Sequence, residues 1–163
     1  MLRRLMAPMV GSLMGLAVAG SIALATDDKT YAGAACVKEG TAGVLEADLY
    51  GRAFNRSSTA TLTVICPVVR DDTGGAFDGG RATVIDQHYS QNVTCSLVNY
   101  SEWGPGWNGY ISRTTSGSSP SPMVLNFSGA NNIDSNAYYA MRCVIPPTYS
   151  GNASGVWAYK VME

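Results

Sequence analysis

The sequence has a single histidine, little net charge and few signs of helix. Its 163 residues hold 11 lysines and arginines against 12 aspartates and glutamates, a formal net charge of −1. Charge this weak and scattered gives no electrostatic footprint for nucleic acid, and it supports no anionic membrane as a partner. After residue 26 no window repeats apolar residues at helical spacing over three turns, which excludes a helical bundle.

Signatures of catalysis are also missing. The chain contains no G-x-S-x-G nucleophile elbow, and its acidic residues follow no spacing diagnostic of a glycosidase. Asp86, His88 and Ser90 have the residue types of a hydrolase triad, but on a strand such neighbours lie about 6.5–7 Å apart. A triad needs heavy-atom contacts of about 2.6–3.2 Å. We predict a partly exposed polar strand face and no enzyme; the alternatives are a small extracellular hydrolase using His88 and a binding or pH-sensing role for it.

The first 25 residues have the three parts of a secretory signal peptide. Two arginines precede an apolar stretch that ends in the small-x-small motif Ala23-Leu24-Ala25. A membrane anchor is the competing interpretation, because a span needs about 20 apolar residues, but glycines and serines dilute this stretch. We predict a signal peptide over residues 1–25 and a single β-sandwich domain over residues 26–163. The protein is then secreted, extracellular or periplasmic, with no stable membrane anchor after cleavage.

Four cysteines lie in the part of the chain predicted to be exported. They are Cys36, Cys66, Cys95 and Cys143. Their spacings are too wide for a Cys-x-x-Cys zinc or redox motif. Because disulfides persist in an oxidising compartment, two bridges are expected. Three pairings are possible, and the spacings do not choose among them.

Strand patterns run through the predicted mature chain. In residues 59–66, Leu62 and Val64 share one face and threonines occupy the other, and Pro67 should end this strand or place its end at an edge. Seven more candidate strands cover residues 44–54, 82–90, 93–100, 109–115, 123–128, 137–145 and 155–162. We predict an all-β fold, an antiparallel β-sandwich of jelly-roll or Greek-key type with about eight strands and two disulfides. A partly closed barrel is the alternative.

The second and third of these seven candidates follow each other closely. Ser90, Gln91 and Asn92 form the predicted turn between them, and the return strand starts at Val93. The interpretation is a hairpin that Cys95 ties down, with the side chain of His88 left unexplained.

Aromatic side chains concentrate in residues 101–110. Trp103, Trp107 and Tyr110 belong to a Gly- and Pro-bearing segment, and flat rings on a loop can stack on sugars while Asn108 and Glu102 supply hydrogen bonds. The alternative is that the tryptophans are buried and pin a long connection onto the sandwich. We take Trp103, Trp107, Tyr110 and Asn108 as the candidate ligand-binding set, with a glycan or a cell-surface component as the partner.

The loop DDTGGAFDGG raises the question of a metal ion. It offers Asp71, Asp72 and Asp78 as oxygen ligands, a hard-donor set that suits Ca²⁺. Its spacing misses the EF-hand pattern, and aspartate beside glycine is typical of a solvated turn. We expect a plain turn and no cofactor, with calcium as the alternative.

The chain also contains N-x-S/T triplets, which accept glycans in a eukaryotic secretory pathway. They begin at Asn55, Asn92, Asn99, Asn126 and Asn152. In a bacterial protein the same asparagines would be unmodified.

Four short motifs are spread along the predicted mature chain: SSTAT at 57–61, CPVVR at 66–70, VID at 84–86 ahead of VTC at 93–95, and CVIPP at 143–147. Together they resemble a group of uncharacterised small secreted bacterial proteins. This resemblance implies export and a shared cysteine framework, and it brings no activity, ligand or site residue. The residues themselves favour a secreted, non-catalytic binding or surface-interaction module, with a carbohydrate-binding module using exposed aromatics as the alternative.

Overall fold

Strands dominate the computed structural model, as the alternation of apolar and polar residues predicts. The structure describes residues 28–70, 79–100, 107–128 and 137–162. Branched side chains such as valine, isoleucine and threonine suit a pleated surface that is buried on one face. In the described part of the chain, no helix has the length and apolar character of a membrane span.

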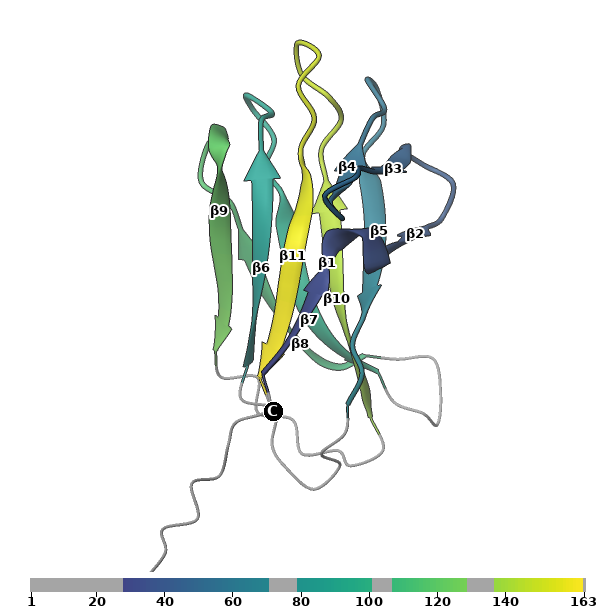
Figure 1. Ribbon diagram of the computed structural model, residues 1–163, viewed down its shortest axis with the longest axis vertical. Helices are drawn as coiled ribbons and strands as arrows, with labels where there is room; N and C mark the ends of the chain where they lie inside the picture. Colours follow the sequence, from purple (N-terminus) through teal and green to yellow (C-terminus); the bar gives the residue numbers. More distant parts are fainter. Residues whose placement is uncertain (1–27, 71–78, 101–106, 129–136, 163) are drawn as a thin grey trace, which may run out of the picture.

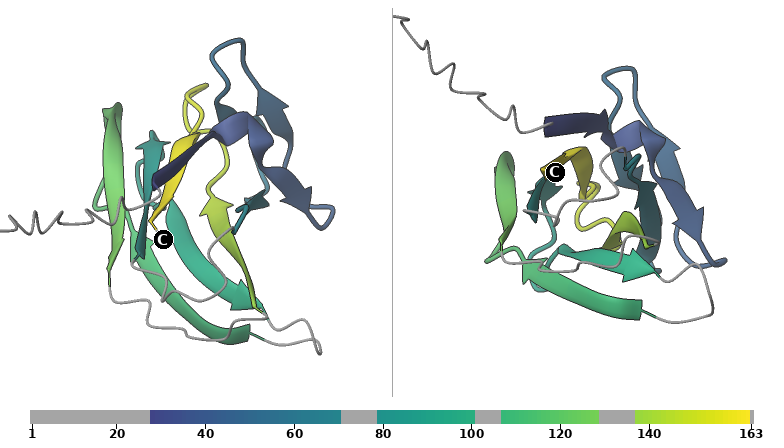
Figure 2. Two further views of the ribbon diagram at one scale, coloured as in Figure 1. Left: turned by 60° about the horizontal axis from the view of Figure 1, so that its bottom comes forward. Right: turned by 90° about the horizontal axis from the view of Figure 1, so that it is seen from below.

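Two antiparallel sheets face each other (Figures 1 and 2). The six-stranded sheet has the order β3-β4-β11-β6-β9, and β1 also pairs with β11. Its strands are β1 (Asp28–Ala32), β3 (Leu45–Ala47), β4 (Ala53–Asn55), β6 (Gly79–Asp86), β9 (Ser119–Ser128) and β11 (Gly155–Met162). The other sheet has the order β2-β5-β10-β7-β8. Its strands are β2 (Val37–Glu39), β5 (Leu62–Pro67), β7 (Thr94–Tyr100), β8 (Trp107–Thr114) and β10 (Tyr138–Ile145).

The chain passes repeatedly from one sheet to the other. Among the described strands only β3–β4 and β7–β8 are sequential pairs within one sheet. This arrangement confirms the predicted antiparallel sandwich, and the two predicted disulfides are also present. The predicted hairpin between β6 and β7 is wrong, because these strands belong to opposite sheets.

Most of the predicted strands have different bounds in the structure. The stretch 44–54 is a hairpin of β3 and β4, because the Asp48 side chain and Gly51, at a φ of 76°, close a turn inside it. The stretch 82–90 ends as a strand at Asp86. Prolines behave as expected: β5 ends at Pro67, and the edge strand β9 accommodates two more.

Two short strands share the edge of β11 that faces away from β6, and β11 has a bulge between them. β4 pairs with Gly155 and Val156, whereas β1 pairs from Ala158 onward, with the register shift between Val156 and Ala158. The short 3-10 turn η1 (Gly33–Ala35) follows β1 and packs on this point. A Cβ at Gly33 would come 2.0 Å from the Val156 carbonyl oxygen, so only glycine permits this approach.

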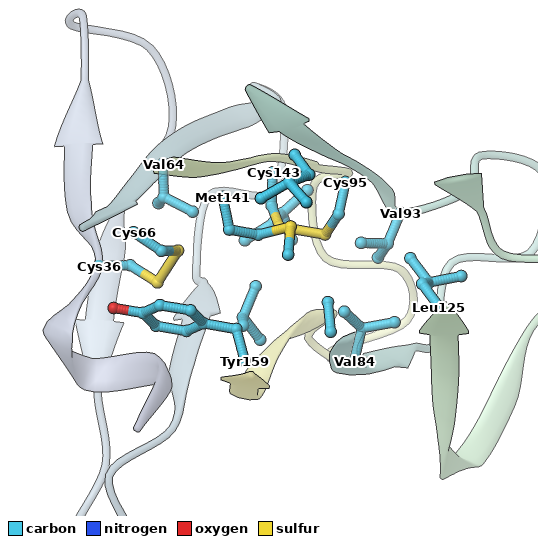
Figure 3. Close-up of a cluster of buried hydrophobic side chains, with 14 of the residues drawn as sticks. Cys36, Val64, Cys66, Val84, Val93, Cys95, Leu125, Met141, Cys143 and Tyr159 are labelled. Carbon is cyan, nitrogen blue, oxygen red and sulfur yellow. A yellow bond between two sulfur atoms is a disulfide. The ribbon is translucent and has the colours of Figure 1, made fainter. Parts of the chain in front are cut away.

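The core lies between the sheets and contains both disulfides (Figure 3). The bridges are Cys36–Cys66 and Cys95–Cys143, and no cysteine is free. Cys95 and Cys143 are opposite each other on β7 and β10, so this bridge links neighbouring strands of one sheet. From the other sheet Tyr159 reaches across and donates to the Pro67 carbonyl at 2.6 Å, and burial raises the pKa of its hydroxyl.

Candidate functional site

Asp86, the last residue of β6, is fully buried and accepts four hydrogen bonds. Its Oδ1 accepts the His88 backbone N–H at 3.1 Å and the Ser154 hydroxyl at 3.3 Å. Its Oδ2 accepts the Val93 backbone N–H at 3.0 Å and a short bond from the Thr115 hydroxyl. Both carboxylate oxygens therefore accept hydrogen bonds from groups of this chain, near and far in sequence, and the side chain stabilises the fold.

His88 is 7% exposed and uses its imidazole to close the following turn. Nδ1 accepts the backbone N–H of Ser90 at 3.2 Å and that of Gln91 at 2.9 Å. An accepting Nδ1 places the proton of the neutral ring on Nε2. The histidine that the sequence leaves unexplained thus acts as a turn-capping residue.

The predicted polar strand face at Asp86, His88 and Ser90 is wrong. The strand ends at Asp86, and two of the three side chains are buried instead of partly exposed. Within the described residues no hydrogen bond joins the imidazole to the Asp86 carboxylate or to the Ser90 hydroxyl. The arrangement does not form the relay that a hydrolase triad needs.

Three tyrosines lie on the outer face of the five-stranded sheet, two of them exposed and Tyr100 partly buried. Tyr110 on β8 is 60% exposed and lies opposite Val98 of β7. Tyr100 and Tyr138 are opposite each other on β7 and β10, and their rings stack at a centroid distance of 5.1 Å with 11° between their planes. We call these three tyrosines the sheet-face tyrosines. They sit on paired strands, so their spacing is fixed by the register of the sheet.

Polar groups continue the same face along the strands. Ser96 and Ser112 share a hydroxyl hydrogen bond of 2.5 Å, and Thr94 and Thr114 share one of 3.0 Å. On the next strands, Arg142 Nε donates to Glu39 Oε2 at 2.7 Å. Burial, with the charge of Glu39 as a smaller cause, raises the pKa of Tyr100, so its hydroxyl stays a neutral donor and acceptor. The face therefore offers flat rings beside ordered hydroxyl groups.

The structure reaches only part of the predicted ligand-binding set. Trp107 lies opposite Tyr100 in the register, and Asn108 falls at the irregularity where the β7–β8 pairing shifts. Trp103 and Glu102 lie outside the described residues, as do Asp71, Asp72 and Asp78 of the candidate calcium loop. Within the described ranges no group of three His, Cys, Asp or Glu side chains is placed to hold a metal ion.

The five candidate glycan acceptors separate into two groups. Asn55 and Asn99 are buried. Asn55 donates to the Ala60, Ile145 and Pro146 carbonyls and accepts the backbone N–H groups of Val44 and Ser57. A side chain with these contacts has no room for a glycan, so this triplet is structural. Asn92, Asn126 and Asn152 are exposed.

Sequence reasoning missed the aromatic pairs. Tyr100 and Tyr138 are separated by 38 positions, and only the β7–β10 pairing makes them neighbours. A second pair, Tyr89 and Tyr149, comes from two connections and stacks at 5.9 Å. The available signal was nine tyrosines in one chain, but tyrosine content does not say which rings meet.

The fold and these surfaces define the class of the molecule as a disulfide-linked antiparallel β-sandwich with exposed tyrosines. No protein-family model matches the chain, and no curated protein does. Among solved structures, the xylan-binding module CBM86 from Roseburia intestinalis has 13% identity and a TM-score of 0.49, over 83% of this chain and 96% of that one. A family two carbohydrate esterase from Cellvibrio japonicus has 8% identity and a TM-score of 0.47, over 84% of this chain and 34% of the esterase. A CBM36 module described with calcium and xylotriose has 9% identity and a TM-score of 0.41, over 83% of this chain and 99% of the module. Values this low define neither a family nor a ligand for this chain.

Proposed function

We propose that the protein is a non-catalytic binding module that holds a glycan on the outer face of its five-stranded sheet. The observation that carries this proposal is the grouping of the sheet-face tyrosines, Tyr100, Tyr110 and Tyr138, on rigidly paired strands. Tyrosine combines an apolar ring with a polar tip, which matches the apolar faces and hydroxyl edges of sugars.

The polar part of the same face completes the proposed surface. Hydroxyl pairs on β7 and β8 and the Arg142–Glu39 pair supply donors and acceptors beside the rings. These groups are already ordered by their mutual hydrogen bonds, so binding would cost little side-chain entropy. An extended neutral chain fits such a face better than a compact ion.

The structural roles of the candidate catalytic residues Asp86 and His88 support a non-catalytic function. The Asp86 carboxylate and the His88 imidazole both satisfy backbone donors within one connection. Two disulfides suit an oxidising compartment. We therefore place the module outside the cytoplasm, where polysaccharides and glycosylated surfaces are its partners.

A glycan array tests this proposal directly. Wild type should bind a subset of neutral glycans, and Tyr110→Ala and Tyr138→Ala should each weaken that binding by about tenfold, since a stacked ring is lost. Trp107→Ala tests a second member of the ligand-binding set that the sequence predicts, on the same strand as Tyr110. Tyr50→Ala is the matched control, because this tyrosine is exposed on the distant β3–β4 turn.

Two results would contradict the proposal. One is an array on which the disulfide-intact protein binds no glycan. The other is binding that Tyr110→Ala and Tyr138→Ala leave as strong as the control leaves it, which would move the site away from this face.

A further inference from the structure

Three connections meet at the end of the sandwich where β6 ends (Figure 1). They follow β6, β8 and β10 and cover residues 87–93, 115–118 and 146–154. The buried Asp86 carboxylate joins all three. It binds Val93 in the first connection, Thr115 in the second and Ser154 in the third. One group that anchors three loops holds them in a single arrangement before any ligand arrives.

Two tyrosines form a supported stack at this end. Tyr89 is 74% exposed, and Tyr149 is 44% exposed. Their ring centroids are 5.9 Å apart with 27° between the planes, and Tyr149 also lies 5.4 Å from the imidazole of His88. The turn-capping His88 therefore supports Tyr149, and Tyr149 supports Tyr89. The outermost ring keeps most of its surface in water.

A shallow pocket of about 170 Å³ is lined by these connections and by the start of β9. Its lining consists of Gln87, Ser118, Ser119, Pro120 and Asn152. Gln87 lies two positions before Tyr89, and Asn152 exchanges two backbone hydrogen bonds of 2.9 and 3.0 Å with Tyr149. The lining carries amides, hydroxyls and one apolar ring, and none of its side chains is charged.

The turn that presents Tyr149 and Asn152 is strained. Its central residues, Ser150 and Gly151, have φ angles of 50° and 80°, and Ser150 is the one non-glycine residue with positive φ in the described part of the chain. This is the geometry of a two-residue type I′ turn, in which serine is less favourable than asparagine or glycine. Backbone strain of this kind is concentrated at functional sites.

From these contacts we propose a second binding site at this end, for one neutral sugar ring. The exposed Tyr89 ring would stack on the apolar face of the sugar, and the amides and hydroxyls of the pocket would bind its edge. Sites for drug-sized ligands measure roughly 300–1,000 Å³, so a smaller pocket suits a single ring of a chain. The uncharged lining selects against acidic sugars, whose carboxylate would have no cation to face.

This site goes beyond the proposed sheet-face site and is separate from the sheet-face tyrosines. It lies at the Thr94 end of β7, whereas Tyr100 ends that strand six residues later, about 20 Å away at the rise of an extended chain. The pocket is formed by described residues throughout, and it uses none of the sheet-face tyrosines.

An NMR titration of the ¹⁵N-labelled protein tests the second site. The probes are the methyl glycopyranosides of glucose, galactose, mannose and xylose, with methyl glucuronide as the charged comparator. At least one neutral probe should shift the amides of Tyr89, Tyr149 and Asn152. Tyr89→Ala and Asn152→Ala should each weaken that binding by about tenfold, and the charged comparator should bind at least about tenfold more weakly. Unchanged thermal midpoints would show that the variants still fold.

The variants separate the two proposals. Tyr110→Ala should leave the titration at Tyr89 unchanged, and Tyr89→Ala should leave binding at the sheet face unchanged. The second site is overturned if millimolar neutral glycosides shift none of these amides, if Tyr89→Ala binds them as wild type does, or if glucuronide binds equally well. None of these results bears on array binding that depends on Tyr110.

Discussion

Two aspartates each hold a turn in this molecule, one in the interior and one at the surface. Asp86 is fully buried and accepts bonds from three separate connections. Asp48 is partly exposed and binds only within its own hairpin, to the backbone N–H groups of Tyr50 and Arg52 and to the Arg52 guanidinium. The two side chains make the same kind of bond, but only the first joins distant parts of the chain.

The difference shows how burial changes the weight of one type of contact. When a buried carboxylate is removed, the buried donors that it bound have no water to take its place. Donors at the surface bind water instead. The Asp48 turn has further support, because the Arg52 guanidinium also lies over the rings of Tyr50, Phe54 and Trp157 at 5.0, 5.3 and 4.7 Å. Removal of Asp48 therefore affects only its own hairpin, where the other contacts of Arg52 remain. Removal of Asp86 affects three connections, in which its donors are buried.

The largest expected effect comes from Asp86→Ala. We expect it to reduce the free energy of unfolding by about 3–5 kcal/mol, because four buried donors lose their acceptor. Urea unfolding followed by tryptophan fluorescence measures the loss. Asp48→Ala, in the same assay, should cost clearly less. Equal losses in the free energy of unfolding would show that burial does not make the Asp86 contacts more important than those of Asp48.

A middle-sized effect is expected at His88. His88→Ala should cost about 1–2 kcal/mol, because the backbone N–H groups of Ser90 and Gln91 lose their acceptor. His88→Asn should recover most of this, since its Oδ1 can take the place of Nδ1, while His88→Gln should not. Recovery by glutamine instead of asparagine in the urea assay would refute the capping role.

The smallest expected effect is the pH dependence of the Asp48 turn. The Arg52 side-chain hydrogen bond lowers the pKa of Asp48 from its usual value of 3.8, with backbone hydrogen bonds acting in the same direction and burial against them. A carboxyl whose pKa is lowered by folding adds stability above its unfolded pKa and loses it as pH falls through the folded value. Wild type should therefore exceed Asp48→Asn in stability above about pH 4 and converge with it in stronger acid. A constant gap between thermal midpoints down to pH 2 would show that the carboxylate charge is not the cause.

Much of the fold was predictable from local patterns. Residues 59–66 alternate in the sequence, and from Leu62 onward they form β5 with Leu62 and Val64 inside, and Pro67 ends that strand as predicted. The hairpin at Asp48 was missed, because residues 44–54 are apolar enough to pass for one strand. Less of the candidate site was predictable from the sequence. Tyr110 was predicted to be exposed, but the stacked tyrosine pairs depend on partners far apart in the chain.

The sequence by itself determined that the chain forms strands and that its cysteines suit bridges, since both follow from residue type and short-range periodicity. Only the tertiary structure decided which cysteines pair and which sheet receives each strand. It also decided that Asp86 and His88 lie in the interior, because the chain crosses between the sheets just after Asp86 and brings Thr115 and Ser154 onto its carboxylate. Alternation assigns a side chain to one face of a strand, but burial of that face depends on which segments the fold packs against it.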